Sequence, residues 1–186
     1  MSTGYNNDAS GRFADLARMG ETVFHTRDLA NLWRIENNNT LYTTLKRYVQ
    51  RGLLFRIYKG LYSLKPVGEI DPRLLGAKVL HQYAYVSTET ILAEAGLIQQ
   101  KIGWITFVSA KSKKFSIEDN NYWSRQLADK FLFHPAGIVK KDGIFIATPE
   151  RAVADLLYFN PKAFFDAAHL IDWKKVKKIQ KEIGYL

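Results

Sequence analysis

The sequence predicts an α+β protein in two domains, on three observations. A segment rich in Pro and Gly between Lys65 and Pro72 interrupts the chain, because Pro blocks helix propagation and Gly lowers the cost of a turn. Before this segment, apolar residues recur at helical spacing and then flank a Lys-Gly turn in β-prone runs. After it, helical stretches are mixed with β-prone runs. We therefore expect three helices and a hairpin in a first domain over residues 1–65, a linker over 66–72, and a second domain over 73–186 with a small, largely antiparallel sheet.

Three helices are predicted in the first domain. The first carries a short apolar stripe that ends near Gly20. The second follows Thr26, whose hydroxyl we expect to cap it. The third follows the polar turn Asn37–Asn39 and ends at about Arg51, before Gly52. Since a short turn joins the second and third helices, they form a helix-turn-helix candidate.

The third helix has two chemically different faces when its residues are placed about 100° apart. The apolar face consists of Leu41, Leu45, Tyr48 and Val49. The opposite face carries side chains that hydrogen-bond to bases or phosphates, namely Asn39, Thr40, Thr43, Lys46, Arg47 and Gln50. The neutral residues precede the cations, which matches the way recognition helices insert their N-terminal residues into the major groove.

A hairpin is predicted directly after Gly52, around the turn Lys59-Gly60. From Asn37 to Lys65 the chain holds six basic residues and no acidic one, whereas about three acids are expected at its average frequency. We therefore expect a winged helix that binds DNA. The predicted DNA contacts are Asn38, Asn39, Thr40, Thr43, Lys46, Arg47, Gln50, Arg51, Arg56, Tyr58 and Lys59. The alternative is a winged helix that makes only protein contacts and whose basic face is solvated.

The second domain is predicted to mix helices and strands. One helix begins at Asp71-Pro72 and reaches about Gln82, and another is capped by Ser87 and stops at Gly96. Strands are expected over residues 104–108 and 131–133, and Asp142-Gly143 predicts a hairpin turn between residues 138–139 and 144–146.

Thr148-Pro149-Glu150 predicts the start of a further helix, with a Thr cap and Pro at the first helical position. Glu150 could be read as catalytic, but a capping residue that pairs with a basic neighbour is favoured. For Arg151 we expect a role in holding the helix to the sheet rather than in binding phosphate.

Two groups of lysines lie in the second domain. They are Lys111, Lys113 and Lys114, and then Lys174, Lys175, Lys177 and Lys178, with Lys181 nearby. The second group lies opposite an apolar stripe that runs from Trp173 to Ile183. Each group is either a solvated face or a second contact for a polyanion such as DNA or RNA.

Composition excludes several classes of function. The chain of 186 residues has 27 Lys and Arg against 18 Asp and Glu, and this net charge of +9 favours nucleic acid as a partner. Since it has no Cys, disulfides, thiolate zinc sites and iron–sulfur clusters are excluded. Its four His residues lack the spacing of metal ligands on a helix.

No catalytic motif is present either. Glu89 and Glu94, like Glu150 and Asp155, are five residues apart and point away from each other on a helix. The chain has no phosphate-binding loop and no nucleophile elbow. We expect no enzyme activity, no catalytic residue, no metal and no cofactor. Because no apolar run reaches about 18 residues and the opening segment lacks an apolar core, we also expect a cytoplasmic protein without membrane contacts.

The stretch from Val23 to Leu64 resembles the winged helix of AbiEi-type antitoxins, the antitoxin half of type IV toxin–antitoxin pairs linked to abortive phage infection. The matching segments in this sequence are Phe24–Ala30, Leu45–Leu54 and Arg56 with Lys59–Tyr62 in the first domain, and Tyr85–Leu92, Ala95–Leu97 and Ala147–Leu157 in the second. The last of these resembles the family's Pro-Glu-Arg and Asp-Leu-Leu helix. One departure is Thr88–Thr90, which stands where the family has a small Ser-Ala pair.

The resemblance implies a transcriptional repressor of its own operon that binds double-stranded operator DNA, with paired half-sites expected from the small footprint of one winged helix. It also implies that the second domain is needed to neutralise a nucleotidyltransferase-like toxin without a stable complex. Two alternatives are a winged-helix regulator with no toxin and an enzyme that acts on nucleic acid.

Overall fold

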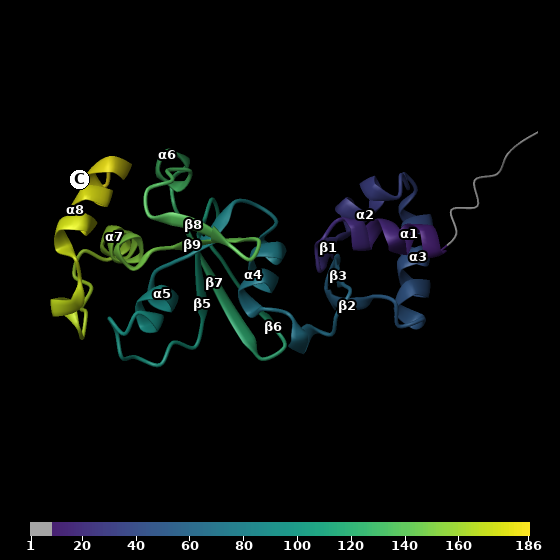
Figure 1. Ribbon diagram of the computed structural model, residues 1–186, viewed down its shortest axis with the longest axis horizontal. Coiled ribbons are helices and arrows are strands. Elements are labelled where there is room, and N and C mark those ends of the chain that lie inside the picture. The colour runs from purple at the N-terminus through teal and green to yellow at the C-terminus, as the bar shows by residue number, and fades with distance from the viewer. Residues whose placement is uncertain (1–8) are drawn as a thin grey trace, which may run out of the picture. The chain divides into compact units, whose positions relative to one another are not determined.

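The computed structural model describes residues 9–186 (Figure 1). The opening segment, on which the signal-peptide expectation depends, lies outside the described residues. The fold is mixed α+β, and the chain divides into two compact units, unit 1 up to Asp71 and unit 2 from Pro72. The predicted linker of residues 66–72 spans this division, and it contains the short 3-10 helix η1 (Val67–Glu69).

Unit 1 contains three helices and three short strands in its described part. In chain order they are α1 (Ala9–Arg18), β1 (Val23–His25), α2 (Thr26–Leu32), α3 (Asn38–Gln50), β2 (Phe55–Tyr58) and β3 (Leu61–Ser63). The strands form an antiparallel sheet in the order β1-β3-β2. The helices and the hairpin were predicted, but β1 was not, because three residues are too few to display alternation.

The core of unit 1 lies between its helices and its sheet. Trp33 and Tyr48 meet edge to face there, with ring centroids 5.5 Å apart. The other buried side chains of this core are Leu16, Phe24, Leu29, Leu41, Leu45, Leu54 and Tyr62. The apolar face predicted for the third helix is therefore the face that packs inward.

The cap predicted for α2 is one residue out of place. His25, and not Thr26, caps this helix: its side chain accepts from the N–H of Arg27, and Asp28 accepts from the N–H of His25. The Thr26 hydroxyl instead donates to the carbonyl of Gly60 over 2.9 Å. Because this bond joins α2 to the β2–β3 turn, it positions the hairpin relative to the helices.

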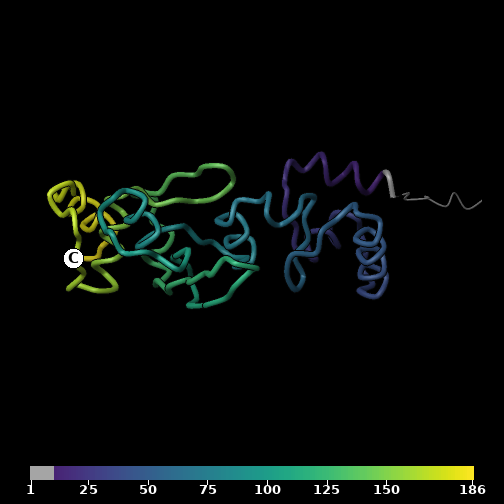
Figure 2. Tube along the Cα trace, turned by 90° about the horizontal axis from the view of Figure 1, so that it is seen from below, coloured from purple at the N-terminus to yellow at the C-terminus, as the bar shows by residue number. Residues whose placement is uncertain are grey.

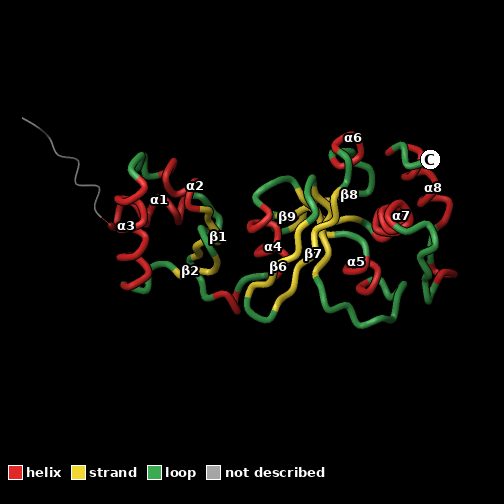
Figure 3. The backbone as a smooth tube through the Cα atoms, turned by 180° about the vertical axis from the view of Figure 1, so that it is seen from behind, coloured by secondary structure: helices red, strands yellow, loops and turns green. Residues whose placement is uncertain are grey.

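Unit 2 is built on one six-stranded sheet with helices on both faces. Its elements are α4 (Pro72–Leu80), β4 (Ala84–Val86), α5 (Glu89–Glu94), β5 (Ile105–Ser109), β6 (Lys113–Ile117), β7 (Asn120–Gln126), α6 (Asp129–Leu132), β8 (Ile138–Lys141), β9 (Ile144–Ala147), α7 (Pro149–Phe159), the 3-10 helix η2 (Ala168–Leu170) and α8 (Trp173–Ile183). Helix α4 covers one face of the sheet, α5 and α7 cover the other, and α8 packs against α7 (Figures 1 and 3).

The sheet is larger than predicted and is mixed rather than largely antiparallel. Its order is β6-β7-β5-β4-β9-β8, so the β6–β7 and β8–β9 hairpins form its two sides (Figure 2). The β5–β7 and β4–β9 pairs are parallel. Strands β4, β6 and β7 were not predicted from the sequence. Strand β7 contains mostly polar residues, yet it buries Tyr122 and Ser124 and lies inside the sheet.

The strand predicted over residues 131–133 is wrong, because this segment contains the end of helix α6. Phe131 and Leu132 are buried and Phe133 is exposed, and such a short apolar run does not distinguish a strand from a helical turn. By contrast, the Asp142-Gly143 hairpin and the Thr148 cap of α7 are as predicted.

The central sheet and α4 approach each other closely at Gly76. A Cβ atom at this position would lie 2.6 Å from the Tyr122 ring and 2.7 Å from that of Phe107. Glycine therefore allows α4 to pack against two aromatic rings on this face of the sheet.

Candidate nucleic-acid interface

The polar face of α3 is open to solvent along its whole length. Asn37 caps the helix by accepting from the N–H groups of Asn39 and Thr40, so the polar residues after it belong to the first turn and not to a preceding loop. All eleven predicted DNA contacts are exposed, eight of them from Asn38 to Arg51 on or just after α3 and the other three on the hairpin. The structure therefore brings the predicted residues together in one compact unit, which ends at Asp71.

The hairpin presents the remaining predicted contacts. Strand β2 has a register irregularity between Arg56 and Tyr58, both of which are exposed, and Lys59 follows in the turn. Gly60 has φ +75°, a left-handed conformation that favours glycine, and this closes the turn.

A hollow of about 390 Å³ lies between α3 and the hairpin. Its lining residues are Tyr42, Lys46, Val49, Gln50, Arg56 and Tyr62. Burial raises the pKa of Tyr62, and the charge of Arg56, opposite it in the sheet, acts against this rise. Three predicted DNA contacts, Lys46, Gln50 and Arg56, therefore line the same hollow as the aromatic rings of Tyr42 and Tyr62.

Tyr42 is the residue of this surface that the sequence reasoning missed. Its side chain is 54% exposed, and it lies on α3 next to the predicted contacts. Tyr42 lies four residues after Asn38 and four before Lys46, so its place on the polar face of the helix is the signal that could have identified it.

The basic charge of this surface is not neutralised within the described residues. None of the six cations between Asn37 and Lys65 has a described carboxylate within ion-pair distance. Their charge is therefore available to an external anion.

The first lysine group of unit 2 does not form one surface. Lys113 and Lys114 are neighbours on β6, and successive side chains of a strand point to opposite faces of the sheet. Lys113 lies over the ring of Phe115, whereas Lys114 lies over Trp104 and Trp123. Lys111 is exposed in the turn before this strand.

The second group occupies the exposed face of α8. Val176, Ile179 and Ile183 are buried beneath it, as predicted, while Trp173 is 40% exposed. Two of the lysines have carboxylate partners, Lys175 with Glu150 at 3.0 Å and Lys178 with Glu182 at 3.9 Å, and Lys174 and Lys177 are exposed without one among the described residues. The pairing of Glu150 agrees with the structural role favoured for it. Although burial acts the other way, the N–H groups and Lys175 around it lower its pKa.

Arg151 is fully buried and joins α7 to the sheet, as predicted. It donates to Asp155 over 2.9 Å, to the Tyr85 hydroxyl over 2.8 Å, and to the carbonyls of His134 and Ala136. These bonds engage Nε and both terminal nitrogens of the buried guanidinium, so Arg151 is not free to bind a phosphate.

Ser87 belongs to the same buried cluster. Its hydroxyl donates to Asp155 over 2.8 Å, which corrects the prediction that it caps the following helix. Helix α5 begins after Thr88, which is fully buried and has a φ of +54°. This cluster accounts structurally for two charged residues of α7, Arg151 and Asp155.

Two searches of the described residues bear on other kinds of site. Residues 9–186 contain no group of three or more His, Asp or Glu placed to hold a metal ion. No helix in the same range is long and apolar enough to cross a membrane. In comparisons with known proteins, no protein-family model and no curated protein matches this chain.

Proposed function

We propose that unit 1 is a winged-helix domain that binds double-stranded DNA. The observation that carries this proposal is the surface formed by α3 and the β2–β3 hairpin, where eleven polar, basic or aromatic side chains are exposed and no acidic residue occurs. Strand β1 pairs with β3 and so completes a three-stranded antiparallel sheet beside the hairpin, as a winged helix requires. In this arrangement α3 enters the major groove and the hairpin lies along the backbone.

The division of chemistry along α3 supports sequence-specific binding. Asn39 and Thr43 are neutral and can read base edges, whereas Lys46 and Arg47 lie further along and suit phosphates. One winged helix covers a small footprint, so we propose binding to paired half-sites.

We further propose that the protein is an antitoxin-like repressor of a type IV toxin–antitoxin operon. This rests on the resemblance of segments in both units to AbiEi-type antitoxins. Unit 2 would then be needed to neutralise a nucleotidyltransferase-like toxin, without a stable complex between the two proteins. No residue of unit 2 is assigned a catalytic role in this proposal.

The test of DNA binding is a titration of the full chain against the DNA upstream of its own gene, with random duplex of equal length as the control. Preferential binding to the upstream DNA is the expected result. Equal affinity for the two duplexes would contradict a repressor. The test of the antitoxin role is co-expression with the product of the neighbouring gene, where restored growth is expected.

A regulator without a toxin is the second candidate. The same surface of α3 supports it, since DNA binding is common to both candidates. The neighbouring reading frame separates them, because only the antitoxin requires a nucleotidyltransferase-like neighbour.

A further inference from the structure

Aromatic rings and cations alternate on one face of the sheet in unit 2. Lys114 Nζ lies 5.3 Å from the ring of Trp104 and 4.6 Å from that of Trp123. The guanidinium carbon of Arg125 lies 4.2 Å from the Trp123 ring and 5.5 Å from that of Phe159. We call these five residues the cation–aromatic row. They come from the segment before β5, from β6 and β7, and from α7.

The register of the sheet explains how the row forms. Lys114 and Trp123 are direct partners across the antiparallel β6–β7 pair, and Arg125 follows two residues later on the same face. An ion pair with Glu89 of α5 holds Arg125 in place. The row is thus anchored at the end near the helices.

The other end of the row is open. Trp104 is 37% exposed, Lys114 is exposed, and no described carboxylate lies within ion-pair distance of this lysine. Strand β6, which carries Lys114, is one of the two edge strands of the sheet. An aromatic ring and a cation without a described carboxylate partner are therefore presented together to solvent.

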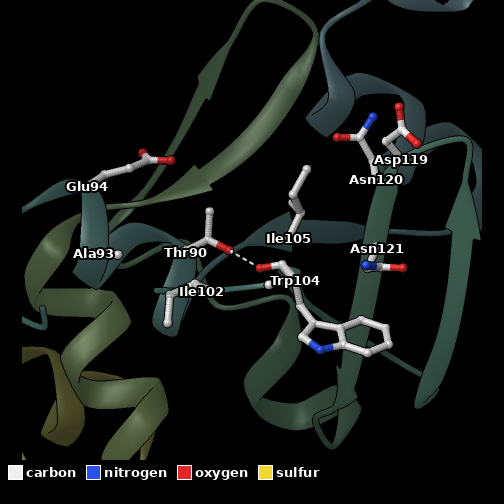
Figure 4. A pocket seen from close by; sticks show the side chains of 10 residues that line it. Thr90, Ala93, Glu94, Ile102, Trp104, Ile105, Asp119, Asn120 and Asn121 are labelled. Carbon is white, nitrogen blue, oxygen red and sulfur yellow. Dashed lines mark hydrogen bonds between the residues drawn. The ribbon is translucent and has the colours of Figure 1, made fainter. Parts of the chain in front are cut away.

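A hollow of about 570 Å³ adjoins this open end and shares Trp104 with it. Figure 4 shows the Trp104 indole at the lower border of the hollow, the Glu94 carboxylate at its upper left and the Asp119 carboxylate at its upper right. Asn121 of β7 also lines it, and the Ser116 hydroxyl donates to the Asn121 side-chain oxygen over 2.7 Å. This bond leaves the amide nitrogen of Asn121 as a donor for a ligand.

We propose that this surface binds a single-stranded polynucleotide, with one base stacked on Trp104 and the adjoining phosphate at Lys114. Indole faces accept any base, and neighbouring cations track the backbone, which is the combination that single-strand binding surfaces use. A base entering the hollow can accept from Asn121. Duplex DNA does not suit this surface because its base faces are already stacked within the helix.

The carboxylates that line the hollow determine how the polynucleotide lies on this surface. Glu94 is paired with Arg73, but Asp119 is exposed in the β6–β7 turn and repels phosphates. The phosphates therefore run along the side of Lys114, and the bases face the hollow.

The test is a binding titration of the full chain with labelled oligo(dT) and oligo(U) of about fifteen nucleotides, a length that covers a typical single-strand site. Trp104→Ala and Lys114→Ala are compared with Phe164→Ala, a control that removes a 78% exposed ring elsewhere in unit 2. Thermal unfolding of each variant checks that the fold is intact. Tighter binding of oligo(U) identifies RNA as the ligand, and tighter binding of oligo(dT) identifies single-stranded DNA.

We expect Trp104→Ala to weaken oligonucleotide binding by about tenfold, Trp104→Phe to restore part of it, and Phe164→Ala to have no effect. Binding of operator duplex, measured alongside, should be unchanged by Trp104→Ala, so failure of this proposal is distinguishable from failure of the function proposed for unit 1. Three results overturn the proposal: no binding of either oligonucleotide, an affinity that Trp104→Ala leaves unchanged, or equal competition by heparin, which has the charge but no bases.

Discussion

Arg151 and Asp155 form an ion pair in the interior of unit 2, with a distance of 2.9 Å between Arg151 Nε and Asp155 Oδ1 and with both side chains fully buried. They are four residues apart on α7 and therefore lie on the same side of the helix. The Tyr185 and Ser87 hydroxyls also donate to Asp155, from the end of the chain and from the end of β4. The pair thus connects α7 to the sheet and to the segment after α8.

The first prediction concerns the stability that this pair provides. Removing one partner leaves an uncompensated buried charge, so Arg151→Met should lower the free energy of unfolding by about 3 to 5 kcal/mol. Urea denaturation followed by circular dichroism measures the change. Lys178→Met, which breaks an exposed pair with Glu182, is the matched control and should have little effect. Similar losses in the two variants would contradict the structural role of Arg151.

The second prediction concerns stability at high pH. Burial and the nearby charge of Asp155 raise the pKa of Tyr185, whereas a tyrosine in the unfolded chain titrates near about 10. The folded protein keeps this proton when the unfolded chain releases it, so the contribution is complete below pH of about 10 and is lost as the pH rises above it. Tyr185→Phe should therefore make the alkaline decline of the unfolding free energy shallower.

The same variant tests the hydrogen bond of Tyr185. At neutral pH, Tyr185→Phe should lower the free energy of unfolding by about 1.5 to 3 kcal/mol, because the Tyr185 hydroxyl donates to the Asp155 carboxylate over 2.6 Å. Unfolding curves at neutral and alkaline pH measure both effects. An alkaline slope equal to that of the unaltered chain would show that Tyr185 is not linked to folding in this way.

The third prediction concerns base recognition by α3. Because Asn39 and Thr43 are exposed and uncharged, Asn39→Ala or Thr43→Ala should reduce the preference for operator over random duplex by about 1 to 3 kcal/mol. Gln100→Ala, which removes an exposed amide in unit 2, is the control. If affinity for the two duplexes fell equally, these residues would not read bases.

The fourth prediction concerns the hairpin. Lys59 is exposed in its turn, where it would meet phosphates of any sequence. Lys59→Ala should weaken all duplexes alike and should reduce the salt dependence of binding by about one ion. Lys162→Ala, an exposed lysine after α7, serves as the control. An unchanged slope in a salt titration would remove Lys59 from the interface.

The fifth prediction separates the two units. A fragment ending at Asp71 contains all of unit 1 and should retain DNA binding, with lower affinity if the lysines of unit 2 add contacts. The same fragment should not rescue growth from a co-expressed toxin. If it restored growth as well as the full chain does, unit 2 would have no part in neutralisation.

Features that depend on neighbours within a few residues could be predicted from the sequence. The two faces of α3, the Asp142-Gly143 turn and the Thr148 cap were predictable because helical spacing and turn geometry act locally. The sequence also allowed the structural role of Arg151 to be favoured over phosphate binding, although it did not reveal the partners.

The contacts between distant segments, by contrast, are seen only in the folded chain. Tyr85 and Arg151 are 66 residues apart in the chain, and Trp104 joins Lys114 only because β6 pairs with β7 beside β5. Strand β7 is mostly polar, so no local pattern in the sequence predicts that it lies inside the sheet. Its place in the sheet depends on packing against other elements, such as that of Tyr122 against Gly76 of α4. The free energy of this packing comes from residues that are distant in the sequence, so no local pattern predicts it.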